Sequence, residues 1–368
     1  MTSSRPDLAD LERSALEEAL SARGHQRFRA RQIFGWIYRR GVTGVSAMTN
    51  LPRDLRETLE RDFEFTTPAL AARERSADGT EKFLLRLSDG RQVEAVFIPD
   101  TPSMTFCIST QVGCAMACAF CLTGKMGLVR NLTAGEIAGQ VRVLAGALDM
   151  RDKPFNIVLM GMGEPLHNYD ETMRALRILN DEHGLAVPMR RVTLSTVGLL
   201  PALERLAHEP LMPNLAISLH APTDELRGRL VPLNRKYGVK EIIEACERFP
   251  LAKRRRITFE YVLLAGVNDS PDAARRLARL LAGVKSKVNL IPLNAAPGIP
   301  FDRPSDAAID RFARILAEHH LVVSVRKSRG RDIRAACGQL IVDGEKRSPG
   351  QALAAALPSE PQPGHFRL

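Results

Sequence analysis

The spacing of apolar residues changes along the chain and predicts two kinds of element before residue 100. Residues 9–66 carry apolar positions at helical spacing, such as Ile33 and Ile37, with arginines around them. This pattern predicts a small basic helical unit. Residues 82–98 alternate apolar and polar positions on both sides of Asp89-Gly90, which predicts a β-hairpin with a tight turn.

From residue 104 onward, short apolar runs alternate with helix-like stretches. The runs lie at 104–108, 157–160, 192–195, 215–219, 258–263 and 288–291, and the helix-like stretches include 133–148, 170–180, 239–248, 271–282 and 306–318. This alternation predicts an α/β fold with a parallel sheet and right-handed crossovers. Six units favour a partial (βα)6 barrel, and a doubly wound open sheet is the alternative. In both folds, functional residues belong at the carboxyl ends of the strands.

These patterns divide the chain into four segments. We expect an N-terminal helical domain over 1–80, a β-hairpin and linker over 81–103, a partial barrel over 104–341 and a disordered tail over 342–368. The tail contains Pro349, Pro358, Pro361 and Pro363, a composition typical of disorder.

Composition and charge restrict the class of protein. The 368 residues are 45% hydrophobic and 26% charged, as in water-soluble globular proteins. No apolar run approaches the ~20 residues of a membrane span, and the first eighteen residues lack the apolar core of a signal peptide, so we expect a cytoplasmic protein. The net charge is +10, with basic clusters over 27–40, 253–256 and 326–334. Such clusters favour a polyanionic partner.

Three of the six cysteines, Cys114, Cys118 and Cys121, have the spacing C-x₃-C-x₂-C directly after the first predicted strand of the barrel. Three thiolates from one loop can hold three irons of a 4Fe-4S cluster and leave the fourth iron open to a substrate. The alternative is a structural zinc site completed by Cys107 or by a distant histidine.

This motif at the start of a β/α repeat resembles the radical S-adenosylmethionine (SAM) superfamily. The resemblance implies that the open iron binds SAM and that an electron from the cluster cleaves SAM to methionine and a 5′-deoxyadenosyl radical. It also implies SAM contacts at later strand ends, and the matching residues are Gly163, Glu164, Pro165, Ser195, Ser218, Leu219, His220 and Asn294. Glu164 can accept a hydrogen bond from an ammonium group, whereas His220 taken alone would be assigned to packing.

Five motifs in order narrow the resemblance to one family. They are Gln111-Val112-Gly113-Cys114, Arg130-Asn131-Leu132-Thr133, Gly161-Met162-Gly163-Glu164-Pro165-Leu166, Ser218-Leu219-His220-Ala221 and Ala335-Ala336-Cys337-Gly338-Gln339-Leu340. Together they resemble the RlmN family of bacterial adenine-C2 RNA methyltransferases over about residues 25–341. The implied substrates are the adenosine at position 2503 of 23S rRNA and the adenosine at position 37 of certain tRNAs.

The resemblance implies a covalent route that consumes two SAM molecules, because adenine C2 has no lone pair with which to attack a methyl group. One SAM methylates Cys337, and the radical from the second abstracts hydrogen from that methyl group, whose carbon then joins C2. Cys107 is implied to release the product through a disulfide with Cys337. Glu94 is implied to accept the C2 proton, although the hairpin pattern alone would leave it a solvated charge. Cys246 fits a packing role.

Three other functions stay open at this point. An enzyme of the related Cfr type would methylate C8 of the same rRNA adenosine, a glycyl-radical activase would use the same cysteine spacing, and a zinc-stabilised RNA-binding protein would catalyse nothing. The resemblance favours the C2 enzyme, with a flavodoxin as electron donor and no membrane partner. It also implies that the N-terminal helical unit contacts RNA.

Overall fold

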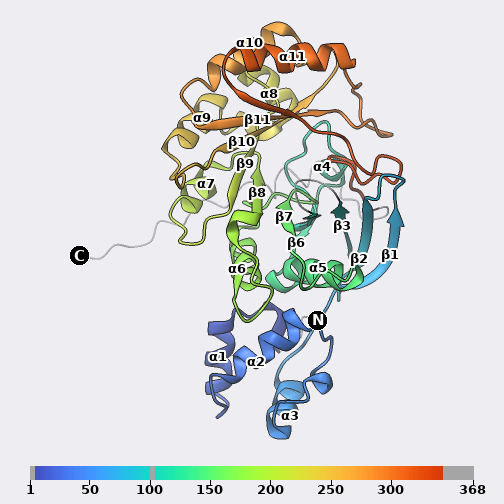
Figure 1. The fold of residues 1–368 in the computed structure, drawn as a ribbon, viewed down its shortest axis with the longest axis vertical. Helices are drawn as coiled ribbons and strands as arrows, with labels where there is room; N and C mark the ends of the chain where they lie inside the picture. Colours follow the sequence, from blue (N-terminus) through green and yellow to red (C-terminus); the bar gives the residue numbers. More distant parts are fainter. Residues whose placement is uncertain (1–4, 100–103, 343–368) are drawn as a thin grey trace, which may run out of the picture.

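The computed structural model describes residues 5–99 and 104–342. Helices near the N-terminus lie below a large mixed sheet, and further helices cover that sheet (Figure 1). Apart from Val342, the predicted tail lies outside the described residues.

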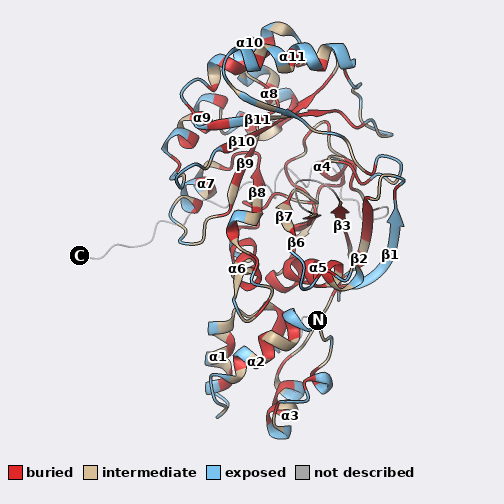
Figure 2. Cartoon of the chain, viewed as in Figure 1, coloured by how far each residue is buried: buried red, intermediate tan, exposed pale blue. Residues whose placement is uncertain are grey.

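The N-terminal unit is helical, as its apolar spacing predicts. Its α-helices are α1 (Arg13–Ser21), α2 (Arg29–Phe34), which continues into a π-helical turn (Gly35–Arg39), and α3 (Arg53–Asp62). Short 3-10 turns lie at Leu8–Asp10 and Val45–Ala47. Leu16, Ile33 and Leu59 are fully buried, whereas the outward faces of these helices are exposed (Figure 2).

Ten strands form one sheet in the order β1-β2-β3-β4-β7-β8-β9-β10-β11-β12. The antiparallel part is β1 (Ala69–Arg75), β2 (Glu81–Arg86), β3 (Gln92–Ile98) and β4 (Thr105–Cys107). The strands that continue parallel from β4 are β7 (Asn156–Leu159), β8 (Val192–Thr196), β9 (Asn214–Ser218), β10 (Ile257–Leu263), β11 (Ser286–Pro292) and β12 (Val322–Val325). A separate antiparallel pair contains β5 (Gln111–Gly113) and β6 (Leu128–Asn131).

The predicted partial barrel of parallel strands is confirmed. The six predicted strands correspond to β4, β7, β8, β9, β10 and β11, and they lie side by side in chain order. A doubly wound sheet reverses its strand order at a switch point, so that alternative is wrong. The edges β1 and β12 do not pair with each other, which leaves the barrel open.

Four strands were not expected from the sequence: the short pair β5 and β6, and the two edge strands of the large sheet. β1 lies in the segment that we assigned to the helical domain, and β12 adds a parallel strand after α11. All residues of β1 and most residues of β12 are exposed, as Figure 2 shows for β1. Neither strand has one buried face, so neither carries the alternating pattern that reveals a strand in a sequence.

The remaining α-helices connect or cover the strands. They are α4 (Leu122–Met126), α5 (Ala134–Ala147), α6 (Tyr169–Asn180), α7 (Leu200–Leu206), α8 (Asp224–Leu230), α9 (Val239–Arg248), α10 (Pro271–Leu280) and α11 (Asp306–Glu318), with 3-10 turns at Met189–Arg191 and Pro232–Arg235. All five predicted helices are present. Within residues 5–99 and 104–342, no helix has both the length and the apolar character needed to cross a membrane.

Candidate active site

The three cysteines of the C-x₃-C-x₂-C motif lie in the loop between β5 and α4. Backbone hydrogen bonds hold both ends of this loop: Cys114 N–H donates to the Gly127 oxygen at 3.0 Å, and Leu122 N–H donates to the Gly338 oxygen at 2.8 Å. Gly113 has a φ of +76°, and a Cβ there would lie 1.8 Å from the Gly127 oxygen. The loop can therefore turn at this position only with glycine.

All three motif cysteines line one open cavity with about 890 Å³ of empty space, a volume that includes the solvent at its mouth. Six of the eight residues predicted to contact SAM line the same cavity: Gly163, Glu164, Ser195, Ser218, His220 and Asn294. Pro165 and Leu219 are not among the lining residues, and Leu219 is fully buried. The cavity thus joins the cysteine loop to the carboxyl ends of the parallel strands.

The donor set fits an iron–sulfur cluster better than a zinc ion. Burial raises the pKa of the three thiols, and charge on neighbouring cysteines raises it further, so their thiolates require a cationic group beside them. One zinc ion would need its ligands about 2.3 Å from a single point. In the described part of the chain, no three His, Cys, Asp or Glu side chains could hold one ion. A cluster instead takes each thiolate on a separate iron.

Glu164 is a buried carboxyl group on the wall of this cavity. Its Oε1 accepts the Leu166 N–H at 3.0 Å and its Oε2 accepts the Val197 N–H at 2.9 Å. Burial nevertheless raises its pKa to about 7. A carboxylate keeps further lone pairs, so an ammonium group in the cavity would find an acceptor here. Gly163 has a φ of +104°, and a Cβ there would lie 2.7 Å from the Gln111 Cβ, so the turn before Glu164 requires glycine.

His220 is a neutral donor at the cavity wall. Its Nδ1 accepts the Val262 N–H at 3.1 Å, which leaves the ring proton on Nε2. Burial lowers the pKa of the ring to about 3, and the nearby Arg227 guanidinium lowers it further. The ring also packs edge-on against Phe120, with centroids 4.7 Å apart. Packing and cavity lining are therefore both roles of this histidine.

Arg227 fixes the strand ends beside His220, and sequence reasoning missed it. This fully buried guanidinium donates to the backbone oxygens of Val197 (2.6 Å), Ser218 (3.1 Å) and Leu219 (3.0 Å) and to Asn234 Oδ1 (3.0 Å). Burial lowers its pKa to about 10. An arginine in an ordinary helix gives no sign of this role.

Glu260 was also missed, although the sequence held a signal. This carboxylate stands inside the apolar run 258–263, where a lone charge is unusual. In the structure it is buried, lines the same cavity as the motif cysteines, and accepts a hydrogen bond of 2.7 Å from Asn289.

Cys107 and Cys337 line a second, smaller cavity with about 450 Å³ of empty space, and Cys337 lines the larger cavity as well. Both residues are free thiols in the structure. Burial raises the pKa of Cys107 to about 12, charge on Cys337 adds to this, and Arg326 opposes it. Asn294 donates to the Cys337 oxygen at 3.3 Å, which links the Cys337 loop to β11. Cys246, by contrast, is buried in α9, as expected of a packing residue.

Glu94 lies in a different hollow from the two cysteines. It lines a groove beside β2 and β3, and its side chain is buried, so the alternative of a solvated charge is wrong. Its Oε1 lies 3.1 Å from Lys82 Nζ, and its Oε2 accepts the Ile341 N–H at 2.9 Å. Burial raises the pKa of Glu94, and Lys82 opposes this. Ile341 follows Cys337 by four residues, so the groove and the cysteine cavities share one segment.

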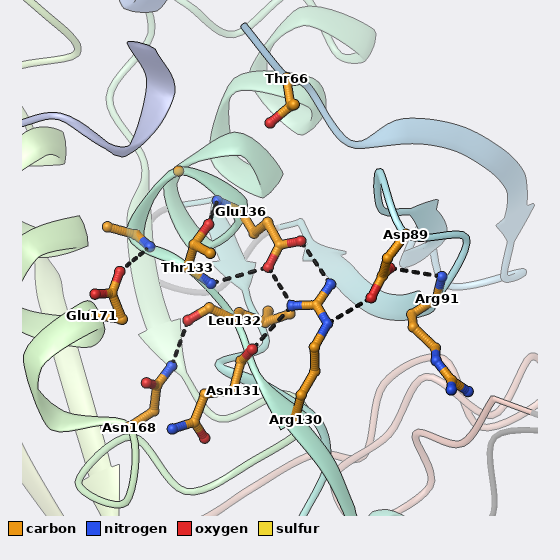
Figure 3. A network of polar contacts seen from close by, with 12 residues as sticks. Thr66, Asp89, Arg91, Arg130, Asn131, Leu132, Thr133, Glu136, Asn168 and Glu171 are labelled. Carbon is orange, nitrogen blue, oxygen red and sulfur yellow. Dashed lines mark hydrogen bonds and ion pairs between the residues drawn. The ribbon is translucent and has the colours of Figure 1, made fainter. Parts of the chain in front are cut away.

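The Arg130-Asn131-Leu132-Thr133 motif ties the hairpin to the barrel (Figure 3). Arg130 donates to both oxygens of Glu136 at 2.7 and 2.8 Å, and to Asp89 in the hairpin turn at 2.7 Å. Glu136 and Thr133 form the capping box of α5. This network joins the turn between β2 and β3 to β6 and to the start of α5.

Comparisons with known proteins agree with this arrangement. The profile of the radical SAM superfamily matches residues 108–278, and that of the ribosomal RNA large subunit methyltransferase N-terminal domain matches residues 6–65. The crystal structure of a radical SAM methyltransferase from Sphaerobacter thermophilus is 50% identical, with a TM-score of 0.87 over 91% of this chain and 99% of that one.

Relatives of this chain are similar over nearly their whole length. The dual-specificity RNA methyltransferase RlmN of Geobacter sulfurreducens is 52% identical over 91% of each chain. The protein of the same name from Anaeromyxobacter dehalogenans is 46% identical over 98% of each chain. With such identity along the chain, and with the cysteine motif at the mouth of the barrel, the protein belongs to the RlmN family of the radical SAM superfamily.

Proposed function

We propose that this enzyme is a dual-specificity RNA methyltransferase that methylates C2 of an adenosine in 23S rRNA and in tRNA. The observation that carries the proposal is the position of Cys337. This thiol lines both the cavity of the cluster cysteines and the smaller cavity of Cys107. One residue can therefore meet SAM on one side and a second thiol on the other, as a covalent methyl carrier requires.

The larger cavity would bind the cofactors. Cys114, Cys118 and Cys121 would hold a 4Fe-4S cluster, which when bound would supply the electron for the reductive cleavage of SAM. Glu164 would accept hydrogen bonds from the SAM ammonium group. The neutral His220 and the polar side chain of Asn294 line the same space.

Two cysteines and one carboxylate would act on the methyl group and the base. Cys337 carries the methyl group taken from the first SAM, and its carbon joins adenine C2 after hydrogen is abstracted from it. Glu94 accepts the C2 proton. Cys107 attacks the Cys337 sulfur, the bond from that sulfur to the methylene carbon breaks, and the carbon takes up a proton to become the methyl group of the released RNA. Thiol exchange later reduces the resulting disulfide. Arg326, which lines both cavities, favours the thiolate of Cys107.

The surface of the N-terminal unit supports an RNA partner. Phe28 is 45% exposed, and the Arg29 guanidinium lies 4.7 Å from the centre of its ring. Arg40 lies over Trp36 at 4.1 Å. Aromatic rings paired with arginines can stack on unpaired bases. A target adenosine must be unstacked before its C2 can react.

We further propose that the enzyme acts in the cytoplasm, with a flavodoxin as electron donor.

The proposal is tested by mass spectrometry of nucleosides. Unmodified 23S rRNA and tRNA are incubated anaerobically with reconstituted enzyme, SAM and a strong reductant. We expect 2-methyladenosine from the native enzyme and none from Cys337→Ala. Cys246→Ala, which removes another buried cysteine, should retain activity. Detection of 8-methyladenosine instead would show that the enzyme methylates C8 and not C2. SAM cleavage without any RNA modification would refute the proposed substrates.

A further inference from the structure

Lys82 is a buried cation beside the carboxylate that we assign to proton transfer. It lies on β2, and its side chain is only 10% exposed. Its Nζ lies 3.1 Å from Glu94 Oε1 and 3.2 Å from Glu74 Oε1. Lysine is almost never buried unless it is paired. Its position therefore depends on these two carboxylates.

Glu94 is held at both of its oxygens. Lys82 contacts Oε1, and the Ile341 N–H donates to Oε2 at 2.9 Å. One contact comes from the hairpin and the other from the segment that follows Cys337. Together they fix the plane of the carboxylate relative to the Cys337 loop, and each oxygen keeps a free lone pair.

The groups around Glu94 act on its pKa in opposite directions. Burial and Glu74 raise its pKa, while Lys82 and the Ile341 N–H lower it. Asp332 and Arg334, from the segment before Cys337, line the same groove. Among the residues that the structure describes, Lys82 is the cation that forms an ion pair with this carboxylate. Without it, burial would favour the neutral acid.

We propose that Lys82 is a positioning residue that keeps Glu94 ionised and oriented to accept the proton from adenine C2. The inference rests on the proposed function, because Glu94 receives this proton only after the methyl carbon of Cys337 has joined the base. In that step the adduct would give its unpaired electron back to the oxidised cluster, the C2 proton would pass to a Glu94 oxygen, and the electron pair of the C–H bond would restore the aromatic ring of the base. A protonated Glu94 already carries a proton and cannot accept the one from C2. Without loss of that proton the RNA would stay attached to Cys337.

The test compares Lys82→Met with Lys82→Arg, each as holoenzyme with intact chain, SAM, reductant and RNA. Lys82→Met should still cleave SAM and form an RNA–protein adduct, visible on a denaturing gel, with at least about tenfold less 2-methyladenosine near neutral pH. The yield of 2-methyladenosine should recover at higher pH, because Glu94 then ionises. The pH of half-maximal product formation should therefore rise by about one pH unit or more. Lys82→Arg keeps the cation and should restore release, and Lys240→Met, at an exposed lysine, should change nothing.

A second measurement separates this inference from the proposed function. Infrared spectra identify the Glu94 carboxyl group by its loss in Glu94→Gln and report its protonation without any substrate. We expect Glu94 to be ionised near neutral pH in the native protein and in Lys82→Arg, and protonated in Lys82→Met. If the native enzyme produced no 2-methyladenosine, the proposed function would fail, and these spectra would still test Lys82. An unshifted Glu94 band together with an unshifted pH profile in a folded Lys82→Met protein would overturn the inference.

Discussion

Asn268 donates a hydrogen bond of 2.8 Å to the backbone oxygen of His220 and another of 2.7 Å to the Val262 oxygen. Its own Oδ1 accepts the Leu264 N–H at 2.7 Å. His220 has a φ of +61°, a conformation that costs a non-glycine residue about 1 kcal/mol or more. The fully buried Asn268 therefore keeps the cavity histidine in an unfavourable backbone conformation.

Replacing Asn268 with aspartate should destabilise the fold and the cavity together. The new side chain keeps the shape of asparagine but loses both donated hydrogen bonds, and it buries a carboxylate against two backbone oxygens. We expect the free energy of unfolding to fall by about 3 kcal/mol, measured by urea denaturation. Asn180→Asp, which loses one part-buried hydrogen bond to the Val187 oxygen, should cost about 1 kcal/mol. Equal losses in the two variants would contradict this role.

Arg227→Lys should weaken the cluster loop without removing the positive charge. Lysine cannot reach the backbone oxygens on two strands that the guanidinium bonds together. The cysteine loop is also attached to α8, the helix of Arg227, because Ala119 N–H donates to the Leu230 oxygen at 2.9 Å. We expect a loss of about 2–4 kcal/mol in unfolding free energy and fewer irons bound per chain after reconstitution. The exposed Arg229, two residues later, should tolerate the same change, and full iron retention in Arg227→Lys would count against the prediction.

The parts of this site that sequence could predict depend on short-range features. The cysteine spacing and the polar residues at strand ends are local, and parallel strands bring their carboxyl ends to one edge. The surroundings of Glu94 were not predictable, because its Oε2 accepts a hydrogen bond from Ile341, which is 247 positions away. Pro165 and Leu219 were assigned with their motifs, but neighbouring residues in a loop do not all face the cavity. Only the folded chain shows which of them do.

Glu164 should make the stability of the cofactor-free protein depend on pH. Its pKa is raised from 4.5 to about 7 by burial, so the folded state binds a proton more tightly than the unfolded state. The contribution of Glu164 to the free energy of unfolding is therefore fully present below about pH 4.5 and is lost as the pH rises towards 7. The full effect is about 3 kcal/mol. Glu164→Gln, which cannot ionise, should remove this part of the pH dependence in urea denaturation, and an unchanged profile would contradict it.

Gly113→Ala should prevent the cysteine loop from closing. Gly113 has a φ of +76°, and an added Cβ would lie 1.8 Å from the Gly127 oxygen, an atom of the backbone that cannot move aside alone. Gly24→Ala provides a matched control, since Gly24 has a φ of +79° and nothing within 4 Å of its Cβ position. The control should lose only about 1 kcal/mol of stability from the left-handed backbone and should bind iron normally. Gly113→Ala should bind much less iron, because the turn before Cys114 can no longer pair with Gly127. If Gly113→Ala bound as much iron as Gly24→Ala, the contact with the Gly127 oxygen would not be the reason that the loop requires glycine.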